Sequence, residues 1–309
     1  MKTNSRRRLA LRRETVFLLA LAVLLVFSAL PPGQRFWRWA QARAGLSPYP
    51  AAQEQYPLNI YCLSVGKADA ILISCEGEYA LIDSATFDKV DEVWTAARHV
   101  GAQEIKLAFV THPDSDHIGG FPLLFGKIPV GQLVQSEFPG ELTAQNEEYA
   151  LLEKSLREHS VGRLTAQTGD SFRVGGAELT VLGPVGEYAD VNNYSLVLKL
   201  RYGDFSMLFC GDMEEAAETD LMASGADLRA DCLKIAHHGS KTSSTEAFLQ
   251  AVGAGHAVVS AGPDRNNLPR ASVLRRIENA GMEIYRTDLD GTVRISSDGT
   301  EIEIATGEN

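Results

Sequence analysis

Short apolar runs separated by glycine or polar turns fill the chain from residue 58 onward. Runs of about four to eight residues rich in Val, Ile, Leu and Phe are typical of buried strands, and apolar residues recurring every three or four positions indicate helices. The two patterns alternate in two groups, which predicts an α/β fold in two similar halves, each a sheet with helices. Helices are expected at 90–100, 118–125, 141–159, 213–224, 245–252 and 271–280. Strands are expected at 59–65, 70–75, 79–83, 105–111, 163–165, 171–174, 178–182, 196–202, 205–210, 232–236, 256–260, 283–287, 292–296 and 301–305.

The beginning of the chain has a different pattern. Residues 1–14 are basic, and residues 15–31 form an apolar stretch that ends at Pro31. This layout is typical of a short membrane helix or of a secretory signal peptide, and we favour an uncleaved anchor because no small-residue cleavage site follows Leu30 directly. The basic flank predicts a single-pass cell-membrane protein with its C-terminal domain extracytoplasmic, or a secreted protein if the signal is cleaved. Residues 32–57 are expected to be a linker and residues 58–309 the folded domain.

Charge separates these parts further. Residues 1–44 hold nine Lys or Arg and one acidic residue, which leaves 20 basic and 39 acidic residues in 45–309, a net charge of −19. Affinity for nucleic acid comes largely from neutralised phosphates, so DNA is disfavoured as a partner. The four cysteines lie in apolar runs and are expected to be free core thiols, although a disulfide between Cys62 and Cys75 is an alternative in an extracellular domain.

The candidate chemistry is concentrated after the apolar run 107–110. His112, Asp114, Asp116 and His117 fall within six residues and precede Gly119 and Gly120. Two imidazoles and two carboxylates are unfavourable to crowd together unless a cation binds them. Imidazole with carboxylate suits Zn, Mn or Fe, and the absence of thiolate argues against a closed structural zinc site. A solvated acidic loop would account for neither the histidines nor the glycines.

Two further apolar runs end in candidate ligands. Asp212 follows the run 205–210, and His237 and His238 follow 232–236. Ligands at strand ends, on loops held by a rigid sheet, are the expected layout of a metal site. Asp212 can instead cap the helix expected at 213–224. If the strand persists, the two histidines point to opposite faces, so one can face the metal and the other the substrate or the core.

These motifs together resemble the metallo-β-lactamase fold superfamily. The pattern His-x-Asp-x-Asp-His-x-Gly-Gly at 112–120, Gly-Asp at 211–212 and His-His-Gly-Ser at 237–240 carries the resemblance. Within the superfamily, the chain is most similar to the extracellular hydrolase domain of the ComEC/Rec2 competence proteins and their stand-alone relatives, with further similarity at 63–70, 81–83, 192–197 and 285–288. The resemblance implies an αββα four-layer sandwich with a dinuclear metal site at one sheet edge.

The resemblance also implies roles for individual residues. His112 and Asp114 would hold one divalent ion, Asp116, His117 and His238 the other, and Asp212 would bridge them. Asp114 stands where many relatives have histidine, which favours Mn or a mixed site over Zn alone. Asp83 would orient the ligand loop. Asp116 and His237 are the expected catalytic residues, and His237 would contact a transferred phosphate or act as an acid. The expected substrate contacts are Asn193, Ser195, His237, Ser240 and Lys241.

The function these roles imply is hydrolysis. Two divalent ions would activate water as hydroxide for attack on a phosphodiester outside the cytoplasmic membrane. A hydrolase of a cell-wall phosphoester, or of a small ester or lactone, would use the same site, and a non-catalytic metal-binding module is a third alternative. Relatives usually read Asp-Val-Gly-Gln-Gly-Asp-Ala where this chain has residues 64–70. This difference alters the rim of the site, where Lys67 could supply local positive charge, although a solvated surface charge is the default expectation. A small-molecule or cell-surface phosphoester is the expected partner, with the membrane contacted through the N-terminal helix.

Overall fold

The computed structural model describes residue 49 and residues 56–307. By internal contacts the chain divides into two units, Met1–Ser47 and Pro48–Asn309, and the described residues belong to the second. The basic segment, the membrane helix expected at 15–31 and nearly all of the expected linker therefore lie outside the described residues. Among the helices that the structure describes, none has the length and apolar content needed to cross a membrane.

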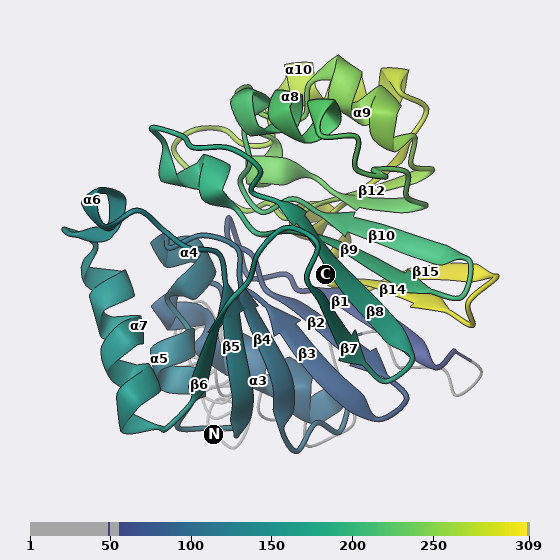
Figure 1. Cartoon of the computed structure of the whole chain (residues 1–309). Coiled ribbons are helices and arrows are strands. Elements are labelled where there is room, and N and C mark those ends of the chain that lie inside the picture. The colour runs from purple at the N-terminus through teal and green to yellow at the C-terminus, as the bar shows by residue number, and fades with distance from the viewer. Residues whose placement is uncertain (1–48, 50–55, 308–309) are drawn as a thin grey trace, which may run out of the picture. The chain divides into compact units, whose positions relative to one another are not determined.

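Two sheets form the centre of the described unit (Figure 1). The first has eight strands in the order β15-β14-β1-β2-β3-β4-β5-β6, and the second has seven in the order β13-β12-β11-β10-β9-β8-β7. The first sheet contains β1 Leu58–Cys62, β2 Ile71–Cys75, β3 Glu78–Ile82, β4 Ile105–Val110, β5 Val130–Gln135, β6 Gly162–Thr165, β14 Val293–Ser297 and β15 Ile302–Thr306. The second contains β7 Ser171–Val174, β8 Ala177–Gly183, β9 Val197–Tyr202, β10 Phe205–Phe209, β11 Cys232–Lys234, β12 His256–Val259 and β13 Glu283–Arg286.

Helices cover the outer face of each sheet, which gives the four layers (Figure 1). On the first sheet lie η1 Phe87–Lys89, α3 Val90–His99, α4 Ser115–Ile118, α5 Phe121–Leu124, α6 Gly140–Thr143 and α7 Glu147–Glu158. The second half contributes η2 Val191–Tyr194, α8 Glu215–Ala223, η3 Ala236–Gly239, α9 Glu246–Val252, α10 Ala271–Asn279 and α11 Thr287–Asp290. The expected αββα sandwich is thus confirmed for the domain, whereas the N-terminal helix stays a prediction.

The burial of each strand explains its sequence pattern. In β4, Leu107 and Phe109 face the core between the sheets, while Ala108 and Val110 face the core under the first helix layer. Both faces are apolar because both are covered. β8 alternates instead, with Leu179 and Val181 buried between the sheets and the intervening residues half-buried.

Some local predictions were wrong for reasons that depend on neighbours. The strand β5 was not expected, because its first half is half-buried to exposed and carries glycine and glutamine. The helix expected at 141–159 is two helices, since the Asn146 side chain accepts a hydrogen bond from Tyr149 N and starts a new helix. The single helix expected at 118–125 likewise is divided between α4 and α5. Residues 287–290 form a helical turn, so Thr287 begins α11 and does not end the strand expected at 283–287.

The cysteines are free. Cys62 pairs with Ile71 and Cys75 pairs with Leu58 in the β1–β2 register, so four residues, about 13 Å of strand, separate the two thiols. A disulfide needs Cα atoms within about 7 Å, and the alternative of a Cys62–Cys75 bond is therefore wrong. All four described thiols are buried and unpaired with one another, and burial raises the pKa of Cys62 to about 12.

Candidate metal centre

The candidate ligands lie on three loops that leave the carboxyl ends of β4, β10 and β11. β4 in the first sheet delivers residues 112–117, whereas the parallel neighbours β10 and β11 in the second sheet deliver Asp212 and His238. Backbone hydrogen bonds fix these loops: Leu196 N, just before β9, donates to the Thr111 carbonyl at 2.8 Å, and His237 N, after β11, donates to the Gly211 carbonyl, after β10, at 3.0 Å. The site therefore forms where the two sheets meet.

Gly211 permits this close approach. Its φ is +53°, and a Cβ at this position would lie 2.8 Å from both the Thr111 Cβ and the Ser195 Oγ. Only glycine combines that backbone conformation with the absence of a side chain. Residue 212 thus stands directly against the loop that follows β4.

Three buried imidazoles are held by their Nδ1 atoms. Nδ1 of His117 lies 2.8 Å from Asp83 Oδ2, and Nδ1 of His238 lies 3.1 Å from the Ser260 carbonyl oxygen. Because carboxylate and carbonyl oxygens only accept, both nitrogens donate. Nδ1 of His112 lies 3.1 Å from Thr111 Oγ1, whose own proton goes to Asp83, so this nitrogen donates too. Each ring therefore presents Nε2 to the site.

These Nε2 atoms are the observation that points to a cation. Nε2 of His112, His117 and His238 and Oδ1 of Asp212 are all buried and find no hydrogen-bond partner among the described residues. Buried polar atoms are normally satisfied, and four acceptors that converge without donors fit a divalent ion. The ligand atoms of His112, His117 and Asp212 lie within 4.8 Å of one another, as do those of Asp116, His117 and His238. The residues present thus fit the metal that the resemblance implies.

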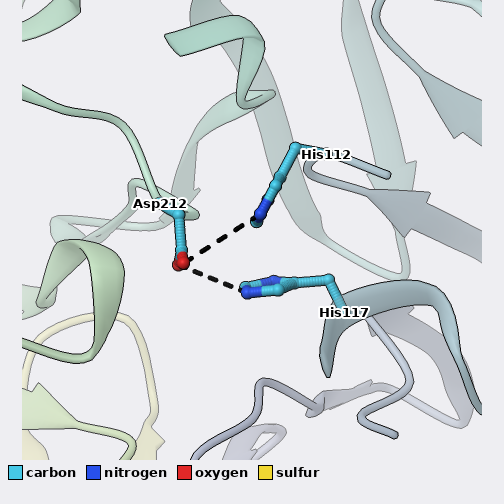
Figure 2. Close-up of side chains that lie close together, drawn as sticks. All are labelled: His112, His117 and Asp212. Atoms are coloured by element: carbon cyan, nitrogen blue, oxygen red, sulfur yellow. Dashed lines mark ion pairs between the residues drawn. The ribbon is translucent and has the colours of Figure 1, made fainter. Parts of the chain in front are cut away.

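Asp212 lies at the centre of the cluster. Figure 2 shows its carboxylate facing the rings of His112 and His117, at 4.0 Å and 3.3 Å from their Nε2 atoms. Nε2 of His238 is 3.7 Å away on the Oδ2 side. Asp212 is not the helix cap considered above, because α8 begins three residues later, at Glu215, and its N-cap is Glu214. This central place fits the bridging role that the resemblance implies, which stays a prediction.

The charges in the cluster are mutually dependent. Burial raises the pKa of Asp212, but the rings of His117 and His238 outweigh burial and hold this pKa well below its usual value. Burial likewise lowers the pKa of His117, and the carboxylates of Asp212 and Asp83 raise it well above its usual value. The cluster therefore attracts positive charge, which a divalent ion supplies more effectively than a proton.

Asp83 fixes the ligand loop from behind. One of its oxygens accepts from Thr111 N at 2.9 Å, and the other accepts from Thr111 Oγ1 at 2.7 Å as well as from His117. Asp69, Asp83 and His117 also come close enough to suggest a further metal group. Since these bonds occupy both Asp83 oxygens, we interpret that group as the support of His117.

The other carboxylates of the motif lie toward the mouth. Asp114 Oδ2 is 3.6 Å from His112 Nε2, and its side chain is 43% exposed. Asp116 Oδ2 is 3.5 Å from His238 Nε2, and its side chain is 14% exposed. Burial raises the pKa of Asp116, but His238 and His117 outweigh burial and lower it. Both aspartates are thus placed to complete an ion's coordination from the open side.

His237 and His238 diverge, but the strand does not direct them. β11 ends at Lys234, and both histidines have positive φ, 49° and 50°, within the turn η3. The explanation from strand alternation was therefore wrong. His238 is buried in the cluster, while His237 is 20% exposed, with Nε2 3.7 Å from Asp212 Oδ2 and Nδ1 3.3 Å from Glu214 Oε1. This places His237 at the mouth.

The residues expected to contact substrate divide into two groups. Ser195 Oγ accepts from Asp212 N at 3.0 Å, and Asn193 Oδ1 accepts from Glu214 N at 3.0 Å, so these buried side chains position the loop that carries Asp212. Ser240 contacts Thr242 through its hydroxyl, and Lys241 is exposed on the loop after η3. A substrate contact stays a prediction for all four.

The contacts of three further residues beside the cluster were not predicted from the sequence. Lys234 Nζ, 1% exposed, donates to Asp69 Oδ2 at 2.8 Å, and Asp69 Oδ1 lies 3.9 Å from His238 Nδ1. The available signal was a lysine inside an apolar strand, which requires a buried carboxylate partner. Lys67, expected to be a solvated charge, instead donates to Asp116 Oδ2 at 2.5 Å.

Comparisons with known proteins identify sequences that are similar to this chain. The family profile described as Metallo-beta-lactamase superfamily matches residues 63–262. The chain is 27% identical to ComE operon protein 3 of Bacillus subtilis over 80% of this chain and 34% of that protein. It is 28% identical to Competence protein ComA of Neisseria gonorrhoeae over 90% of this chain and 38% of that protein. The chain thus spans about a third of the length of these relatives.

Two solved structures share the fold. The metallo-beta-lactamase fold protein YhfI from Bacillus subtilis matches with a TM-score of 0.54 at 11% identity, covering 78% of this chain and 100% of YhfI. CmlA, a diiron beta-hydroxylase from Streptomyces venezuelae, matches with a TM-score of 0.53 at 14% identity, covering 81% of this chain and 55% of CmlA. Because the sequence identities are this low, the similarity to these two structures shows a shared fold and nothing further.

Proposed function

Since the chain belongs to the metallo-β-lactamase superfamily, we propose that it is a metal-dependent hydrolase whose substrate is a phosphodiester. The observation that carries the proposal is the convergence of three buried imidazole Nε2 atoms on Asp212 without any partner among the described residues. A purely structural cluster would satisfy these atoms internally.

The proposed chemistry assigns a task to each part of the site. Divalent ions at such a centre lower the pKa of water and neutralise charge that develops on the substrate oxygen. Asp83, Thr111 and the Ser260 carbonyl orient the rings, so the ligand lone pairs are directed inward before substrate binds. His237, half-buried at the mouth, is the residue that we expect to donate a proton to the leaving group.

The ligand set and the charge favour a small phosphoester. Carboxylates at positions 114, 116 and 212 suit hard ions, so Mn or Zn in two positions is proposed. The names of the relatives refer to competence, but this chain spans about a third of their length. With a net charge of −19 in residues 45–309, we propose a small or cell-surface phosphodiester in preference to DNA.

The proposed location follows from the apolar stretch 15–31 and its basic flank. We propose that this stretch anchors the protein in the cytoplasmic membrane with the domain outside. Protease added to intact cells is then expected to remove the domain while a cytoplasmic marker survives. A domain that is cut only after lysis would refute the extracytoplasmic placement.

The activity is tested on the purified full chain stripped of metal and reloaded with Mn²⁺ or Zn²⁺. We expect the reloaded protein to hydrolyse bis-p-nitrophenyl phosphate and p-nitrophenyl phosphorylcholine and to hydrolyse single-stranded DNA only slowly. EDTA treatment is expected to abolish hydrolysis of all three substrates. Turnover of DNA alone would contradict the charge argument. Bound metal without turnover of any of the three substrates would favour the non-catalytic module.

A further inference from the structure

Lys67 lies on the loop between β1 and β2, and this loop is held in place by the segment after β12. A Cβ on Gly262 would lie 2.5 Å from the Gly66 Cα and 2.7 Å from Lys67 N. Backbone therefore packs directly on backbone at the base of the lysine. The side chain of Lys67 extends toward the metal centre from a fixed point.

The ammonium of Lys67 approaches one of the two candidate ligand groups. Its Nζ donates to Asp116 Oδ2 at 2.5 Å, and the same oxygen lies 3.5 Å from His238 Nε2. Asp116 and His238 belong to one group, together with His117. The other group, formed by His112, His117 and Asp212, is fully buried, and none of its members is bonded to a lysine of the described residues.

His117 is shared by the two groups, although its Nε2 has a single lone pair. That nitrogen can bind only one ion at a time. Whichever ion takes this nitrogen, an ion beside Asp116 also has to share the Asp116 carboxylate with the Lys67 ammonium. A second divalent ion would stand within a few ångströms of that positive charge, in a partly buried site where repulsion is weakly screened.

We propose that Lys67 makes the two metal positions unequal, acting as a built-in cation on Asp116 that weakens binding of the second ion. This inference rests on the proposed function and specifies its metal loading. The protein then binds one ion tightly in the group that lacks Asp116. The second ion binds only by displacing the Lys67 ammonium from Asp116 Oδ2 or by binding close to it against the repulsion of the two positive charges.

The test uses the metals alone. The metal-free full chain is titrated with MnCl₂ and with ZnCl₂ by calorimetry, and bound ions are counted by mass spectrometry after equilibrium dialysis. Lys67→Gln is expected to tighten the second step at least about tenfold, because removing the ammonium relieves a repulsion that is weakly screened in a partly buried site. The first step is expected to stay within about twofold. Lys67→Arg, which keeps the positive charge, should retain the wild-type difference in affinity between the two binding steps.

Lys106→Gln is the matched control. Lys106 Nζ also lies 2.5 Å from a carboxylate, that of Glu78, but this pair is exposed and is formed at the opposite end of β4. Removing the Lys106 ammonium should leave the affinities of both metal-binding steps unchanged. Circular dichroism establishes that each variant folds, and Lys67→Met replaces Lys67→Gln if the latter does not.

Electron paramagnetic resonance adds a readout that needs no variant. At one equivalent of Mn²⁺ the wild-type protein should show the spectrum of isolated ions. If the two positions had equal affinities, some molecules would already hold two ions and show the spectrum of spin-coupled pairs.

An unchanged second step in both neutral Lys67 variants, or equal tightening of both steps, would overturn the inference and leave the hydrolase proposal intact. A single bound ion in the wild type and two in Lys67→Gln would support it, and a single ion in both would overturn it. Failure of every variant and of the wild type to bind any ion would overturn the proposed function as well.

Discussion

Asp212→Asn is expected to lower phosphodiester hydrolysis by about a hundredfold to a thousandfold. The Asp212 carboxylate lies within 4.0 Å of the Nε2 atoms of His112, His117 and His238, so one substitution removes the charge that all three rings surround. Asparagine keeps the shape of the side chain but leaves one neutral oxygen where a bridging carboxylate is proposed. We expect the variant to bind fewer Mn²⁺ or Zn²⁺ ions in equilibrium dialysis and to lose activity in parallel.

The control for this variant is Asp204→Asn. Asp204 is exposed in the turn between β9 and β10, at the end of that hairpin remote from Asp212. This control should retain metal binding and activity. If Asp212→Asn folds, by circular dichroism, and keeps wild-type turnover, the assignment of the metal centre is wrong.

Lys234→Met is expected to destabilise the metal-free protein by about 3–5 kcal/mol. The ammonium of Lys234 and the carboxylate of Asp69 are both at most 2% exposed and lie 2.8 Å apart. Removing the ammonium leaves the buried Asp69 carboxylate without its ion-pair partner. Urea unfolding in the presence of EDTA, at pH 7, measures the loss in the free energy of unfolding.

The pH dependence of that loss has a defined sign. Burial raises the pKa of Asp69, but Lys234 and His238 outweigh burial and hold the folded-state pKa below its usual value. The pair therefore contributes stability that is present above about pH 4 and is lost as the pH falls through the folded-state pKa. In Lys234→Met, acid protonates the stranded carboxylate, so the difference between variant and wild type should shrink as the pH falls.

Two further variants separate the pair from general effects of losing a lysine. Lys199→Met removes a side chain that is 6% exposed and lies 2.7 Å from Asp227, but the Asp227 side chain is 64% exposed and returns to water. The loss of this ion pair should lower the free energy of unfolding by about 1 kcal/mol or less. Adding Asp69→Asn to Lys234→Met should recover much of the loss, and a double variant no more stable than Lys234→Met would contradict the stranded-charge explanation.

The local features of the domain could be read from the sequence because they depend on neighbouring residues. The apolar run of β4 is buried on both faces, and the cluster at 112–117 follows it as the strand pattern requires. The end of β10, and with it Asp212, was placed to within one residue by the same reasoning. β11 ends at Lys234, two residues before the expected end, and the turn η3 carries His238. Four-layer packing followed from the resemblance that these motifs carry.

The pairing of polar groups across the fold was decided only by the tertiary structure. Lys234 and Asp69 are 165 residues apart and Lys67 and Asp116 are 49 apart, so no local pattern relates them. Their partners depend on how closely the loops of two sheets approach, and Gly211 and Gly262 set that approach through contacts visible only in three dimensions. The sequence by itself therefore identified the candidate ligands of a metal. The fold determined which carboxylates are available to it, because a lysine already occupies one of them.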